Sequence, residues 1–147
     1  MIDLHPVSSG FPIASAVFWC IAEGFQFLKR TQKHAHFLRT LAVVFAVLGV
    51  VLAFLTGYTA SSNAGDMPSH VADAVAYHHS WGKFLLVDVV CLAALYYLMN
   101  VAVHARTLLV ALYYLAGVLF VVGTFWVGHL GGELVFSHGV NVITAAR

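Results

Sequence analysis

The chain has 147 residues, of which 61% are hydrophobic and only 9% are charged, and its mean hydropathy is +0.90. Soluble domains carry roughly 25% charged residues, and a soluble domain of this size buries only about two-thirds of its surface, so these side chains need lipid as their solvent. The net charge of +1 gives no basic face for nucleic acid. The two cysteines form no CxxC or CxxCH motif, which excludes a thioredoxin-like dithiol, a zinc ribbon and covalent c-type haem, and we expect Cys20 and Cys91 to be apolar fillers.

Four apolar stretches follow one another along the chain, each near the ~20 residues that cross a hydrocarbon core of about 30 Å. They predict transmembrane helices at about 11–28, 40–58, 84–103 and 107–127, with an outer loop at 59–82 and a C-terminal segment at 128–147, in a single domain of residues 1–147. The leader before the first stretch has no Lys or Arg, so we expect a retained helix rather than a cleaved signal peptide.

Positive charge is unevenly divided between the two sides that these helices define. One side carries Lys29, Arg30, Lys33, Arg39 and Arg106, and the other carries Lys83 and Arg147. The positive-inside rule therefore places both termini outside the cytoplasm, that is N-out and C-out. Short connections favour antiparallel neighbours, so we expect an all-α, up-down four-helix bundle in the lipid bilayer of a bacterial inner membrane.

Small residues and one turn signal refine this picture. Gly49, Ala53 and Gly57 are spaced four apart on the second helix, which is typical of a helix contact in membranes. In the outer loop, Asp66 and Pro68 predict a helix start that continues through the following residues into the third helix.

Two carboxylates fall within the predicted helices, Glu23 in the first and Asp88 in the third. A charged group in a membrane segment is costly and suggests function. Both lie near enough to a helix end for solvation to explain them as well. Asp88 is two and a half turns from His79 on the same helix, so we expect its partner to lie on another helix.

Histidine is the unusual residue, with nine against seven Lys plus Arg. Three lie beside Lys and Arg at the cytoplasmic ends and are interpreted as interfacial residues: His34, His36 and His104. The other six are scattered in sequence but map to the outer end of the bundle: His5, His70, His78, His79, His129 and His138. The topology therefore predicts a histidine cluster at that end.

Two kinds of site would use such a cluster. A b-type haem in a bundle needs axial imidazoles and an apolar slot, and the nearby aromatic residues either line a porphyrin or form an interfacial belt: Tyr77, Trp81, Phe125, Trp126 and Phe136. Zinc or copper would use three of the histidines with Glu133 or Asp88. No H-x-x-x-H spacing supports the second alternative.

The C-terminal segment resembles the closing signature of a bacterial membrane family, domain of unknown function 2231. That signature reads GGxLVYxHGVxV, and residues 131–142 read GGELVFSHGVNV, with Phe136 at the usual tyrosine. The family's opening His-Pro and F-P-I-A are matched by His5-Pro6 and residues 11–14, although Gly10 stands where many members have a second histidine. Thr56-Gly57-Tyr58 and His79 also fit, so the resemblance covers essentially the whole chain.

The resemblance implies a four-helix membrane domain, and relatives fused to Rieske-type or cytochrome-type domains imply membrane redox work. The family positions carried over are His5, His79 and His138, and His129 is added from its place at the end of the fourth helix. We therefore expect two of these four histidines to bind one haem b, in an electron-transfer protein rather than a catalyst.

Three alternatives stay open beside this expectation. The same four histidines would bind zinc or copper in a metal-binding or transport protein, or the chain would be a cofactor-free subunit of a membrane complex. A quinol site near the outer interface is a further option. Expected partners are respiratory or redox membrane subunits or periplasmic cytochromes.

Overall fold

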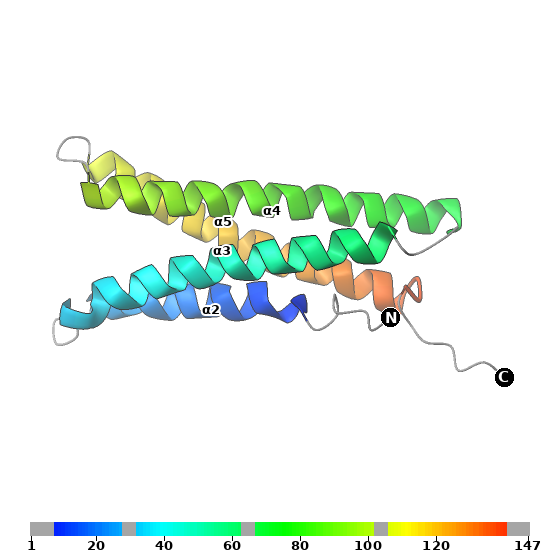
Figure 1. Ribbon diagram of the computed structural model, residues 1–147, viewed down its shortest axis with the longest axis horizontal. Coiled ribbons are helices and arrows are strands. Elements are labelled where there is room, and N and C mark those ends of the chain that lie inside the picture. Colours follow the sequence, from blue (N-terminus) through cyan, green and yellow to red (C-terminus); the bar gives the residue numbers. More distant parts are fainter. Residues whose placement is uncertain (1–7, 28–31, 63–66, 102–105, 141–147) are drawn as a thin grey trace.

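The computed structural model describes residues 8–27, 32–62, 67–101 and 106–140. Its elements are α2 (Gly10–Gly24), the short 3-10 helix η1 (Phe25–Phe27), α3 (Gln32–Ser62), α4 (Ser69–Val101) and α5 (Arg106–Phe136). The helices alternate in direction, and α2 and α4 each contact both α3 and α5, so the chain forms the predicted all-α up-down bundle (Figure 1).

The bundle has two chemically different ends. At the basic end α2 and α4 finish and α3 and α5 begin, and this end lies beside the predicted cytoplasmic loops. At the opposite end α2 and α4 begin and α3 and α5 finish. We call it the histidine end, after His70, His78, His79, His129 and His138.

In the part of the chain that the structure describes, three helices are long and apolar enough to cross a membrane, at His34–Ser62, Ser69–Val101 and Arg106–Phe136. The fourth, α2, has only 15 residues, which measure about 22 Å, and η1 extends it by about 6 Å. The chain is thus a multi-pass membrane protein with three long spans and one shorter helix.

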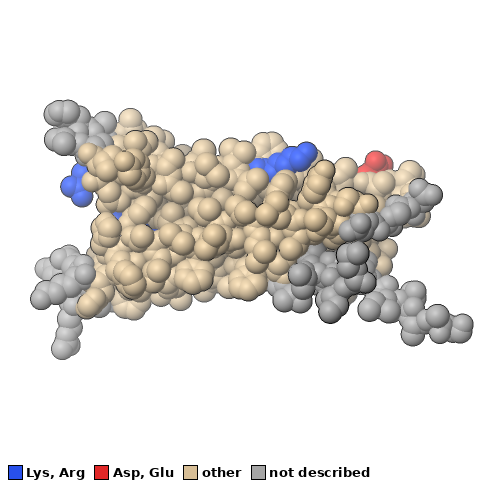
Figure 2. All heavy atoms as spheres, viewed as in Figure 1, with Lys and Arg blue, Asp and Glu red and all other residues tan. Residues whose placement is uncertain are grey.

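Large apolar side chains cover the flanks of the bundle as well as filling its interior. Examples are Phe45, Leu48, Leu55, Phe84, Val87, Val90, Tyr97, Leu115, Val118 and Val122. Figure 2 shows one flank as a surface almost free of charged atoms. Both cysteines are exposed as well, so the expectation that they are fillers of the interior is wrong. Lipid tails are the solvent that matches these surfaces.

Three of the helices, α3, α4 and α5, are longer than the apolar stretches that predict them. At the histidine end α3 continues to Ser62, α4 begins at Ser69 and α5 continues to Phe136 instead of stopping near 127. A helix satisfies its own backbone, so it continues into the polar interface where hydropathy no longer marks it. Gly139, at φ +64, ends α5, and its N–H donates to Val135 O at 3.2 Å in an αL cap.

Small residues let the helices approach closely inside the bundle. Alanines 16, 22, 42 and 46 are fully buried. A Cβ on Gly49 would lie 3.3 Å from the backbone of Phe11, so α2 and α3 nearly touch there, as the small-residue spacing predicted. A Cβ on Gly117 would lie 2.1 Å from the Trp19 ring, which therefore rests directly on the α5 backbone.

A buried ion pair joins three helices near the basic end. Arg39 of α3 donates to both carboxylate oxygens of Glu23 of α2, at 2.8 and 2.6 Å, and Glu23 is only 5% exposed. Tyr113 and Tyr114 of α5 donate to the same carboxylate at 2.6 and 3.0 Å. Trp19 donates to the Tyr113 hydroxyl at 2.9 Å. Glu23 is therefore held by partners from neighbouring helices, and solvation at a helix end does not explain it.

We expect Arg39→Ala to destabilise the bundle strongly, because it leaves the Glu23 carboxylate buried with its tyrosine donors alone. Removing one partner of a buried pair typically costs about 3–5 kcal/mol, which thermal unfolding in detergent would register as a large fall in Tm. The control is Arg106→Ala, since Arg106 is exposed at the start of α5. The apolar double variant Glu23→Leu/Arg39→Met should recover much of the loss, and an Arg39→Ala protein as stable as the Arg106 control would contradict the assignment.

Candidate functional site

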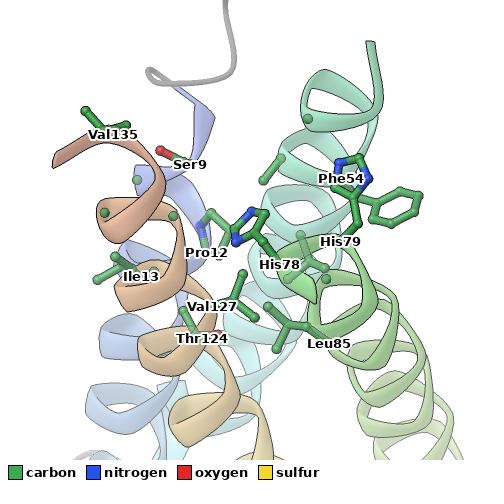
Figure 3. Close-up of a pocket in the computed structure, with 18 of the residues that line it drawn as sticks. Ser9, Pro12, Ile13, Phe54, His78, His79, Leu85, Thr124, Val127 and Val135 are labelled. Carbon is green, nitrogen blue, oxygen red and sulfur yellow. The ribbon is translucent and has the colours of Figure 1, made fainter. Parts of the chain in front are cut away.

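A cavity of about 460 Å³ opens between the four helices at the histidine end (Figure 3). This size falls within the range of about 300–1,000 Å³ that is usual for small-molecule sites. Most of its walls are apolar or lack side chains. The lining residues include Gly10, Pro12 and Ile13 of α2, Val50, Ala53, Phe54 and Gly57 of α3, Gly82 and Leu85 of α4, and Val127, Gly128, Gly131 and Gly132 of α5.

The cavity exists because small residues face each other where the helices separate. Of the small residues spaced along α3, Gly49 packs against α2, whereas Ala53 and Gly57 line the cavity. On α5, Gly128 and Gly131 are within packing distance of neighbouring side chains, but a Cβ on Gly132 would meet nothing within 4 Å. The walls are therefore smooth, as a flat or chain-like ligand requires.

Two adjacent histidines of α4 supply the cavity's basic groups. His78 and His79 both line it and are half-buried. Successive residues of a helix point about 100° apart, and Figure 3 shows the His78 ring directed towards Pro12 of α2 and the His79 ring towards Phe54 of α3. A Cβ on Gly131 would lie 3.3 Å from His78 Cε1, so the glycine makes room for that ring.

A buried hydroxyl adds one further polar group to the cavity. Thr124 is only 1% exposed and lines the cavity, and within the described residues its Oγ1 has no hydrogen-bond partner. One turn along α4 from Leu85, Asp88 Oδ2 is also buried, again with no hydrogen-bond partner in the described part of the chain. The expected partner of Asp88 on another helix is therefore not seen at this atom. Sequence reasoning passed over Thr124, since one threonine in an apolar helix gives no signal.

The histidines predicted as ligands do not all meet at this cavity. His79 lines it, and His78, which the sequence placed at this end without assigning it as a ligand, lines it too. His129 is exposed on α5 and its ring lies 5.8 Å from that of Trp126. His138 lies 5.9 Å from His70, ring centre to ring centre, and neither ring lines the cavity. His5 lies outside the described residues.

The predicted roles of the aromatic residues and of the basic-end histidines can be compared with the structure in the same way. Of the five aromatic residues proposed as a porphyrin lining, Phe136 alone lines the cavity; Trp81 and Trp126 contact each other at 6.1 Å outside it, as expected of an interfacial belt. At the basic end His34 and His36 are exposed, and His104 lies outside the described residues. Within residues 8–27, 32–62, 67–101 and 106–140, no three His, Cys, Asp or Glu side chains gather in a group that could hold a metal ion.

Comparison with known proteins assigns the chain to a family. Residues 1–144 match the family model described as "Predicted membrane protein (DUF2231)", and the chain belongs to this family. No curated protein and no solved structure matches it.

The packing around α5 predicts opposite responses to one added methyl group at two of its glycines. Gly132→Ala places its Cβ in open space and should keep or slightly raise the Tm, because alanine favours a helix over glycine by about 0.5–1 kcal/mol. Gly117→Ala drives a Cβ into the Trp19 ring and should cost about 1–3 kcal/mol or more. Thermal unfolding of both variants in one detergent is the measurement, and equal Tm values would contradict the described packing.

Proposed function

We propose that this member of the DUF2231 family is a membrane redox protein that holds one b-type haem in the cavity at its histidine end. The observation that carries the proposal is the pair His78 and His79 on the wall of an apolar cavity bounded by four helices. Neutral imidazole is a common axial ligand of haem iron, and helical bundles are common scaffolds for such cofactors.

The residues that line the cavity suit a macrocycle in their chemistry. The volume of about 460 Å³ is bounded by the glycine-rich face of α5 and by small residues of α3. Backbone surfaces without side chains let a planar ligand lie close to a helix. Val127, Leu85 and Phe54 supply the apolar contacts that exclude water from such a ligand.

The histidine that would hold the haem iron is on α4. His79 is the residue that the family signature indicates, and His78 is the neighbour that the structure adds. Because they are adjacent on one helix, only one of the two would hold the iron, and a second iron-binding residue would come from another segment. His5 remains the candidate from sequence, and it lies only three residues before Ser8, whose hydroxyl hydrogen-bonds Thr56 of α3 at 2.6 Å.

When bound, haem supplies one-electron chemistry, and the protein supplies position and environment. The α4 imidazole would fix the iron, while the apolar walls keep water out and set the potential. The cavity's position at one end favours electron exchange with a partner on that side, either a redox membrane subunit or a periplasmic cytochrome. Zinc or copper binding at the histidine end stays an alternative, which metal analysis of the same sample would test.

Histidine variants test the haem assignment. The purified wild-type protein, produced with ample haem, should show a Soret band and sharp α and β bands after dithionite reduction. His79→Ala or His78→Ala should lose most of that absorbance, because the cavity then lacks an iron ligand. His129→Ala should keep it, since His129 is exposed outside the cavity. A colourless wild-type protein, or full haem in both cavity variants, would contradict the proposal.

A quinone is the second candidate for the same cavity, and Thr124 favours it. A quinone ring carries a carbonyl at each edge, and both carbonyls accept hydrogen bonds. The buried Thr124 hydroxyl has a proton to donate, and the His78 and His79 rings carry N–H groups on the cavity wall. A haem leaves that hydroxyl without an obvious role, whereas a quinone carbonyl would satisfy it.

Thr124→Val separates the two ligands, because it removes the hydroxyl with almost no change in shape. Binding of a short-chain benzoquinone to the detergent-purified protein should weaken about 5- to 30-fold, as expected for about 1–2 kcal/mol from one buried hydrogen bond. Thr59→Val is the control, since Thr59 is an exposed threonine of α3 whose hydroxyl bonds its own helix at Thr56 O. Equal quinone affinity in the Thr124 and Thr59 variants would exclude the quinone candidate.

A further inference from the structure

A second pair of histidines meets at the outermost layer of the bundle, apart from the cavity. His70 lies in the first turn of α4, and His138 lies in the turn that ends α5. Their ring centres are 5.9 Å apart and their planes make an angle of 55°. Sixty-eight residues of sequence separate them, so only the folded bundle brings them together.

Both backbones that carry this pair are held in place. The αL cap fixes His138, because Gly139 N–H bonds Val135 O at 3.2 Å and Val140 N–H bonds Leu134 O at 3.0 Å. On the other side, Val71 N–H bonds Pro68 O at 3.0 Å in the first turn of α4. Between the two segments, Val75 of α4 and Val140 line a small space of about 70 Å³. The two rings are therefore presented by packed segments.

The two rings make few polar contacts with the described part of the chain. Within the described residues, neither ring takes part in a hydrogen bond or an ion pair, and their contact with each other is the interaction that the structure gives them. His70 is exposed and His138 is half-buried, so both can be reached from the surrounding water or interface.

The ring spacing fits a shared metal ion. An imidazole nitrogen binds its metal at about 2 Å, which places the metal about 3 Å from the ring centre, so two imidazoles on one metal can have centres up to roughly 6 Å apart. The observed separation of 5.9 Å between the ring centres lies within this limit.

The number and the kind of the available ligands favour copper(I) over zinc(II). Zinc in structural sites takes four ligands in a tetrahedron, and no third His, Cys, Asp or Glu joins the pair in the part of the chain that the structure describes. Copper(I) accepts few and soft ligands, among them imidazole and thioether. Met67, three residues before His70, provides a thioether at the same end of the bundle.

We propose that His70 and His138 form a copper(I) site that joins the start of α4 to the end of α5. The site is separate from the proposed haem or quinone cavity, and it gives His138 a role that does not require it to reach that cavity. One bound ion would clamp the two segments at the histidine end, whereas the buried ion pair joins helices near the opposite end.

The test is copper(I) binding by the full chain in detergent, under anaerobic reducing conditions, in competition with a chromogenic copper(I) chelator. We expect one ion per chain, a fall in affinity of at least tenfold in His70→Ala and in His138→Ala, and no change in His129→Ala, the exposed histidine outside the pair. Copper(I) should also raise the Tm of the wild-type protein and leave the Tm of the His70 and His138 variants unchanged.

Three results would overturn this assignment: no copper(I) binding by the wild-type protein, wild-type affinity in both pair variants, or tighter zinc(II) than copper(I) binding at the same histidines.

Both pair residues lie at the accessible surface, so their alanine variants are expected to keep the wild-type fold and can be checked by their unchanged metal-free Tm. The haem spectrum of His70→Ala reports independently on the cavity, because His70 does not line it.

Discussion

The Glu23 carboxylate is the group around which the basic half of the bundle is organised. A carboxylate in an apolar interior is tolerated only when its charge and its lone pairs are matched. Here Arg39 matches the charge and both tyrosines complete the set of donors, so α3 and α5 must meet α2 at that level. The same constraint holds Trp19 against Gly117, because Trp19 donates to the Tyr113 hydroxyl.

Fixing one end of the bundle leaves the other end free to hold a ligand. Near the basic end the polar contacts of Arg39 and Tyr113 run between helices, whereas at the histidine end small residues face an open volume. Lipid offers no hydrophobic driving force to close such a space, since lipid tails are as apolar as the side chains. The cavity is therefore compatible with a stable protein, which explains how a short chain combines a rigid frame with an open volume.

The topology places the outer histidines at one end of the bundle, but the structure gives them different neighbours. His78 and His79 line the cavity. His70 and His138 contact each other outside it. His129 lies against Trp126 on the outer face of α5. About half a turn of a helix is enough to move a side chain from the interior to the lipid face. The proposed cofactor and the proposed copper ion thus involve different histidines of the same end, and they can be tested separately.

The sequence by itself determined that lipid surrounds the helices, how many helices there are and how they alternate, and at which end of the bundle the outer histidines gather. Composition and apolar run length carry that information, because crossing lipid requires about 20 apolar residues whatever the neighbours are. The extension of α5 to Phe136 went unseen, since hydropathy fades in the interface while the helix continues. Only the tertiary structure decided that Arg39 reaches Glu23, that Thr124 faces a cavity and that His138 meets His70. These contacts depend on helix rotation and crossing, which several side chains set jointly and which no periodic pattern on one helix records.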